Sequence, residues 1–176
     1  YAGALLVLAP RHPPRFDEVA QALQARGVSF VRRSAASDIG TTAACAVLLL
    51  DSLGELLDFY AAADVAFVGG SLVPVGGHNL LEPAALGVPI LTGPYNHNSE
   101  EIAQLLIARG AAEVVHDGAE LGQRVGALLA DSTERERMGA AGRASVDSNR
   151  GALAKLLALI EPLLDPPQEV SRQSAS

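Results

Sequence analysis

The sequence has one cysteine, one methionine and no tryptophan among its 176 residues, and only 4% of its residues are aromatic. Because Cys45 has no second cysteine to pair with, an internal disulfide and a cysteine zinc site are both excluded. Basic residues are also few. The 13 Lys and Arg residues stand against 20 Asp and Glu residues, and the resulting net charge of −7 disfavours a nucleic-acid-binding domain. The longest apolar run, residues 43–50, is far shorter than the roughly 18 residues of a membrane-spanning helix.

Apolar residues make up 49% of the chain, which is enough to build the core of one folded domain. The first residue is Tyr1, and an apolar segment starts almost at once, at Gly3. We therefore expect the chain to be part of a longer protein, cut near a domain boundary. The expected domain spans residues 1–164, and the polar, Pro- and Ser-containing residues 165–176 are expected to form a flexible tail.

Short apolar segments alternate with longer amphipathic ones along the chain. The expected strands are residues 5–9, 29–32, 46–50, 65–68, 89–91 and 112–115, and the expected helices are residues 14–26, 53–63, 80–86, 100–109, 119–130, 133–149 and 152–163. This alternation predicts an α/β fold with a Rossmann-like parallel sheet and helices on both faces. Ligands of such folds bind beyond the carboxyl ends of the strands, so the residues that follow each strand are the candidates for a site.

The strongest candidate motif precedes the expected helix 80–86. Asn79 can cap this helix, and Glu82 follows at the spacing of a capping box. Gly76 and Gly77 allow a ligand to approach the backbone, and the start of a helix behind two glycines is a favourable place for a phosphate. The alternative is an ordinary capped helix after a flexible loop. His78 favours the phosphate site, since capping does not require it.

Two further motifs follow expected strands. Pro10 and Arg11 come directly after the first strand, where the planar guanidinium suits a phosphate or carboxylate, and His12 can add a donor. After the third strand, Asp51 or Ser52 can cap the next helix and Glu55 can close a capping box with Ser52. The alternatives are a solvated surface turn for the first motif and a purely structural role for the second.

Several other kinds of site are not supported. The sequence lacks the G-x-G-x-x-G dinucleotide fingerprint after the first strand and the P-loop motif. Ser71 lacks the G-x-S-x-G context of a hydrolase nucleophile, and the four histidines do not have metal-ligand spacing. The loops 69–71 and 93–98 follow the fourth and fifth strands and are interpreted either as close-approach loops or as plain turns.

Together, these segments resemble the C-terminal half of the transferases of 3-deoxy-D-manno-octulosonic acid (Kdo), which move Kdo from CMP-Kdo to a lipid A precursor in lipopolysaccharide synthesis. The resemblance covers about residues 3 to 164. The matching segments are Ala9-Pro10-Arg11-His12-Pro13, Asp51-Ser52-Leu53-Gly54-Glu55, residues 63–72, Gly76-Gly77-His78-Asn79-Leu80-Leu81-Glu82-Pro83-Ala84 and Asn149-Arg150-Gly151-Ala152-Leu153. The sequence departs from the family at Leu50, where Gly is usual, at Leu53, where Met is common, and in the loop 93–98.

The resemblance implies the two-domain GT-B fold, of which this chain is the donor-binding half. It implies CMP contacts at Pro10, Arg11, Leu53, Gly54, Glu55, Gly77, Asn79 and Glu82. It also implies an inverting transfer without a metal or another cofactor. The catalytic base, the lipid A precursor and the contact with the cytoplasmic face of the bacterial inner membrane would belong to the N-terminal half, so no catalytic residue is expected in this chain. Two alternatives remain: a domain of a GT-B UDP-sugar transferase or epimerase, and a non-enzymatic α/β interaction module.

Overall fold

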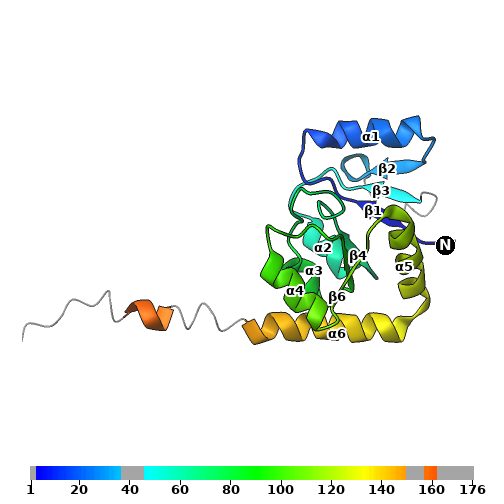
Figure 1. Cartoon of the computed structure of the whole chain (residues 1–176). Helices are drawn as coiled ribbons and strands as arrows, with labels where there is room; N and C mark the ends of the chain where they lie inside the picture. The colour runs from blue at the N-terminus through cyan, green and yellow to red at the C-terminus, as the bar shows by residue number, and fades with distance from the viewer. Residues whose placement is uncertain (1–2, 37–45, 150–156, 162–176) are drawn as a thin grey trace, which may run out of the picture.

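The computed structural model describes residues 3–36, 46–149 and 157–161, and in it strands and helices alternate along the chain (Figure 1). The elements are β1 (Leu6–Leu8), α1 (Arg15–Ala25), β2 (Phe30–Arg32), a short 3₁₀ helix η1 (Arg33–Ala35), β3 (Val47–Leu49), α2 (Leu56–Ala61), β4 (Ala66–Val68), α3 (Leu81–Leu86), β5 (Ile90–Thr92), α4 (Glu100–Ala108), β6 (Ala112–Val114), α5 (Gly118–Ala130) and α6 (Ser132–Asn149). The α/β class predicted from the sequence is confirmed.

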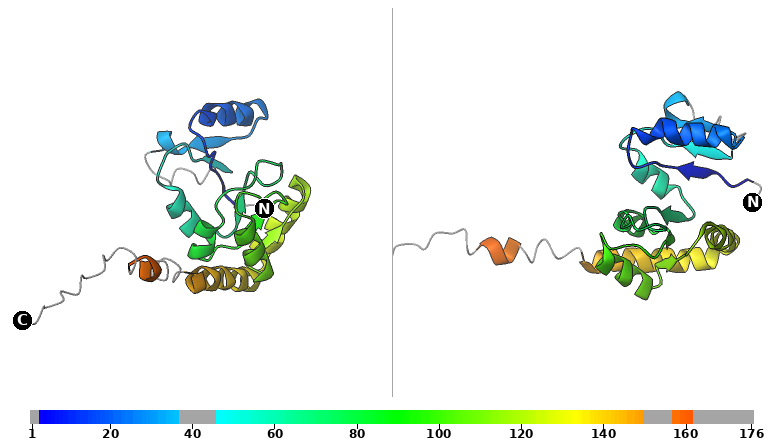
Figure 2. Two further views of the ribbon diagram at one scale, coloured as in Figure 1. Left: turned by 60° about the vertical axis from the view of Figure 1, so that its left-hand side comes forward. Right: turned by 45° about the horizontal axis from the view of Figure 1, so that its top comes forward.

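The six strands form two parallel sheets of three strands each, in the orders β1–β3–β2 and β4–β5–β6. In the first sheet Val47 lies in register with both Leu6 and Phe30, and in the second Ile90 lies in register with both Ala66 and Ala112. In Figure 2, α2 lies between the two sheets. The first sheet and α1 are on one side of α2, and the second sheet and the later helices are on the other. The strands are parallel, as expected, but they form two sheets where the sequence predicted one.

The second sheet is covered on both faces, as the alternation of side chains along its strands requires. Val68 and Ile90 face α3 and α4 and belong to a cluster with Leu80 and Leu106. Leu91 points to the opposite face. The cluster on that face consists of Leu91, Val115, Leu128 and Met138, with Phe67, Leu121 and Val125 packed against it.

Helix α6 packs against α3 through two glycines, Gly139 and Gly142. A Cβ atom at Gly139 would overlap the carbonyl group of Gly87, and one at Gly142 would lie 3.1 Å from the Ala84 oxygen. Gly87 ends α3 in the left-handed conformation, with φ of 72°, as expected for a helix C-terminus. The small residues thus allow the backbones of the two helices to approach closely.

The loops that follow β4 and β5 are tied to each other by a buried serine. The Ser71 hydroxyl donates to the Val68 carbonyl at 2.7 Å and accepts from the Gly93 N–H at 2.8 Å. The Tyr95 N–H adds a bond to the Ser71 carbonyl at 2.9 Å. These bonds fix where the loop toward Gly76 and Gly77 leaves the sheet.

The expected helix 152–163 is described only over residues 157–161. These residues are helical, and Leu157 and Leu159 are exposed. Cys45 and the expected tail 165–176 lie outside the described residues. Within the described ranges, no helix is both long and apolar enough to cross a membrane.

Candidate nucleotide site

Arg11, which follows β1, meets the loop that precedes α3. Its guanidinium Nη1 lies 2.7 Å from Nδ1 of His78. The two residues come from different sheets and are 67 positions apart in the chain. The motif after the first strand and the motif before α3 therefore lie side by side in the folded chain. Pro10, which is half-buried, directly precedes this contact.

The loop before α3 is shaped by its two glycines. Gly76 and Gly77 have φ of 110° and 74°, a region that other residues rarely adopt, and both are buried. The Gly77 N–H donates to the Gly70 carbonyl at 2.8 Å, which closes the loop back onto the end of β4. In this conformation the loop brings His78 beside Arg11.

Asn79 and Glu82 bond to each other, but not as the expected capping box. Asn79 Oδ1 accepts from the Leu81 N–H at 3.0 Å, and Asn79 Nδ2 donates to Glu82 Oε1 at 3.0 Å. The predicted capping by Asn79 is confirmed by its bond to the Leu81 N–H in the first turn, although the assigned N-cap position is Leu80. A capping box would need Glu82 to accept from a backbone N–H. Instead, the pair forms a rigid polar edge with Glu82 Oε2 left to accept other donors.

The motif after β3 forms a second polar cluster around Glu55. Its carboxylate accepts from the Ser52 hydroxyl and from Nε and Nη2 of Arg33, at 3.1 and 2.7 Å. The hydrogen bond from Ser52, with help from Arg33, lowers the pKa of Glu55. Glu55 is therefore held as a carboxylate, already oriented to accept hydrogen bonds.

The expected helix cap by Asp51 or Ser52 is wrong. Helix α2 begins at Leu56, with Glu55 at the N-cap position and no side-chain cap. The Asp51 carboxylate, 3% exposed, instead accepts from the N–H and the hydroxyl of Ser34, at 2.8 and 2.7 Å. The Ser52 hydroxyl donates a hydrogen bond to the Glu55 carboxylate. Helix α2 begins three residues after the expected start at residue 53.

Leu53 and Gly54 form an exposed turn between these groups. Leu53 is 76% exposed, and Gly54 has φ of 87° with open space where a Cβ would lie. Such a turn leaves backbone groups accessible to a flat ring. No hydrogen bond or ion pair among the described residues joins Glu55 to Arg11, Asn79 or Glu82. The structure thus gives two separate clusters, one around Arg11 and one around Glu55.

Sequence reasoning missed Arg33 and Ser34. They follow directly after β2, at the same edge of the first sheet as the residues that follow β1 and β3, because the three strands are parallel. Their position at a strand end was the signal that could have identified them. Arg33 adds a second cation beside this edge.

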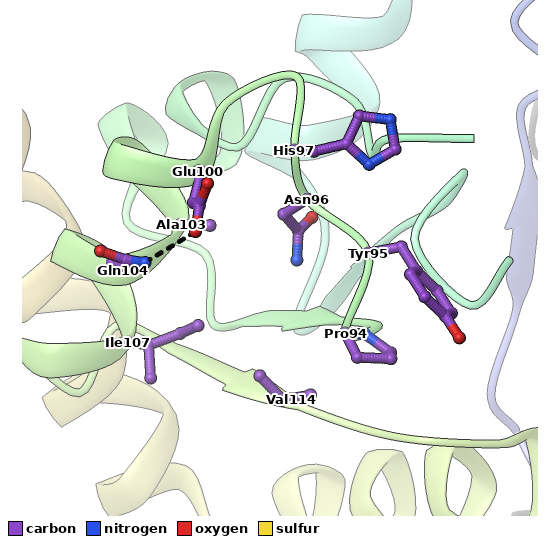
Figure 3. A pocket seen from close by; sticks show the side chains of 9 residues that line it. All are labelled: Pro94, Tyr95, Asn96, His97, Glu100, Ala103, Gln104, Ile107 and Val114. Carbon is purple, nitrogen blue, oxygen red and sulfur yellow. Dashed lines mark hydrogen bonds between the residues drawn. The ribbon is translucent and has the colours of Figure 1, made fainter. Parts of the chain in front are cut away.

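A cavity of about 280 Å³ lies elsewhere, between the loop 94–97, α4 and β6 (Figure 3). Its polar lining includes Asn96, His97, Glu100 and Gln104. The side-chain amide of Asn96 accepts from the Thr92 hydroxyl and donates to the Gly93 carbonyl. Because both ends of the amide are bonded within the protein, this residue is not free to bind a ligand. None of the residues predicted to contact a nucleotide lines this cavity. Among the described residues, no cluster of three or more His, Cys, Asp or Glu side chains is arranged to hold a metal ion.

Residues 43–152 match the glycosyl transferase-like family, which is well over half of the chain. The chain also resembles the crystal structure of the C-terminal CMP-Kdo binding domain of WaaA from Acinetobacter baumannii. The sequences are 38% identical, the TM-score is 0.76, and the match covers 81% of this chain and 73% of the other. The chain belongs to the glycosyl transferase-like family and is related to this CMP-Kdo binding domain. The resemblance stated from the sequence motifs is confirmed.

Complete Kdo transferases show the same relationship. The 3-deoxy-D-manno-octulosonic acid transferase of Haemophilus influenzae is 44% identical over 94% of this chain, and that of Bordetella pertussis is 44% identical over 91%. The match covers only 38% and 37% of those two proteins. The chain therefore spans less than two fifths of the length of these two curated relatives.

Proposed function

We propose that this chain is the donor-binding domain of an inverting Kdo transferase, and that it binds CMP-Kdo at the edge where Arg11 meets His78. The 2.7 Å contact between these residues carries the proposal, since it joins the two phosphate-binding motifs of the sequence. The acceptor is a lipid A precursor. The acceptor site, the catalytic base and the contact with the inner membrane belong to the part of the protein outside this chain.

The residues of the two clusters suit the parts of a cytidine nucleotide. When Kdo is transferred, its bond to the phosphate breaks and CMP leaves with increased negative charge, which the Arg11 guanidinium stabilises without a metal ion. Glu82 accepts from the ribose hydroxyls, which are donors that suit a carboxylate. The turn of Leu53 and Gly54 packs against the base, while Glu55 accepts from donors at its edge. Gly77 gives the loop the conformation that places His78 against Arg11.

We expect the chain to bind CMP more tightly than UMP, because the base edge is recognised by fixed acceptors such as Glu55. In isothermal titration calorimetry, Arg11→Ala and Glu82→Ala should each weaken CMP binding about tenfold, the effect of losing one hydrogen bond to a charged group. Arg26→Ala and Glu136→Ala, at exposed positions of the same residue types, serve as controls and should leave the affinity unchanged.

Two outcomes would contradict the proposal. One is a folded chain that binds no CMP, or binds it equally well after Arg11→Ala and Glu82→Ala. The other is a preference for UDP over CMP, which would select a UDP-sugar enzyme of the same fold. The chain alone is expected to transfer no Kdo, so measurable turnover by it would refute the assignment of the catalytic base to the rest of the protein.

A further inference from the structure

His78 is the partner of Arg11, yet no contact with the nucleotide is assigned to it under the proposed function. Its ring Nδ1 lies 2.7 Å from Arg11 Nη1. Arginine has five N–H donors and no acceptor, and it stays protonated at all ordinary pH values. Nδ1 of His78 must therefore be the acceptor. It follows that the ring is neutral and that its proton sits on Nε2.

The other side of the His78 ring is held by the end of β4. A Cβ atom at Gly70 would lie 3.0 Å from Nε2 and 3.1 Å from Cε1 of the ring. Gly70 has φ of 73°, and its carbonyl accepts the Gly77 N–H that closes the loop. The ring thus lies between a glycine that leaves room for it and the Arg11 guanidinium.

Charge and burial favour the same protonation state. Burial lowers the pKa of His78, and the positive charge of Arg11 lowers it further; a hydrogen bond with the Gly77 backbone opposes them, and His12 adds a smaller lowering. A protonated ring would lose its acceptor and would face the guanidinium with a like charge. Neutral imidazole is the form that the surroundings support.

We propose that His78 is a positioning residue: its neutral ring, packed over Gly70, holds the Arg11 guanidinium in the orientation in which it meets the phosphate of the nucleotide. The Arg11 side chain is exposed and long, so without a partner it would lose conformational entropy on binding. The hydrogen bond to His78 orders the side chain in advance, which is the usual gain from preorganisation. This inference rests on the proposed function, because it assumes a phosphate at Arg11.

The tautomer can be tested without a ligand, by the ring ¹⁵N chemical shifts of His78 in the 176-residue chain at neutral pH. We expect an unprotonated Nδ1 and a protonated Nε2, and a change in the Nδ1 shift in Arg11→Ala. A protonated Nδ1, or shifts that are the same in Arg11→Ala, would overturn the inference whether or not the chain binds CMP.

The positioning role is tested by a double-mutant cycle on CMP affinity. His78→Ala should weaken binding about fivefold, within the usual range of coupling between contacting residues. His78→Asn, which keeps an acceptor near the place of Nδ1, should restore most of the loss. In the Arg11→Ala background, His78→Ala should change the affinity less than twofold. The exposed His116→Ala is the matched control and should have no effect.

The outcomes separate this inference from the proposed function. If the wild-type chain binds no CMP, the proposed function fails and the ring ¹⁵N shifts alone decide whether His78 holds Arg11. If CMP binds and the losses from Arg11→Ala and His78→Ala simply add, His78 acts independently of Arg11 and the inference is wrong. Failure of His78→Asn to restore binding would also count against it, since a positioning role requires only the acceptor.

Discussion

Replacing Gly93 with alanine is expected to destabilise the protein by about 3 kcal/mol, the upper range for overpacking a tightly packed site. The new Cβ would overlap the Ser71 carbonyl group and come within 2.5 Å of the Leu72 nitrogen. Neither group can move easily, because the Ser71 hydroxyl and carbonyl bond Gly93 and Tyr95. Urea denaturation followed by circular dichroism measures the change in the free energy of unfolding.

The same substitution should also weaken CMP binding, since Ser71 and Leu72 begin the loop that ends at His78. Gly69→Ala is the matched control. Gly69 lies in the same region after β4, its φ is not positive, and a Cβ there would meet nothing within 4 Å. A Gly93→Ala protein as stable as the Gly69→Ala protein would show that the loops after β4 and β5 are not packed as described.

Gly139→Ala is the second substitution with a large expected effect. Alanine is a better helix former than glycine by roughly 1 kcal/mol, so on propensity alone the change in α6 should be stabilising. However, its Cβ would overlap the carbonyl oxygen of Gly87 and lie 3.0 Å from the carbonyl carbon. Because that segment is fixed by the bond from the Val88 N–H to the Pro83 carbonyl, α6 must move away from α3. We expect a net loss of about 2 kcal/mol or more in the free energy of unfolding.

The control for this prediction is Gly122→Ala in the middle of α5. Gly122 is exposed, and a Cβ there would meet nothing within 4 Å, so only the helix propensity should change. Thermal unfolding should show Gly122→Ala as slightly more stable than the wild type, and Gly139→Ala as clearly less stable. The same sign for both variants would contradict the close approach of α6 to α3.

The strands and helices were predictable because the spacing of apolar residues and the glycines that end helices are local signals. The six three-residue strands overlap the segments expected from the sequence, and Gly27, Gly87 and Gly110 follow the helices where expected. The division into two sheets could not be read in this way. It depends on which strands pair, and pairing partners such as Leu6 and Val47 lie far apart in the sequence.

The site was predictable to the level of motifs, but not of contacts. Position after a strand singled out Arg11 and His78, and these two residues meet in the structure. Capping was the wrong interpretation for Asp51, because a side-chain partner from another segment can compete with the backbone. The role of the residues that were assigned to CMP stays a prediction.

The most direct test of the central claim is a ¹H–¹⁵N correlation spectrum of the chain recorded during titration with CMP. The nucleotide should shift the backbone amides of Arg11, Gly54 and Asn79 in a saturable way, because these residues come from the three segments that would surround it. The amides of His97 and Gln104, which line the cavity beside α4, should stay in place. Shifts confined to His97 and Gln104, or none at all in the folded chain, would contradict the account.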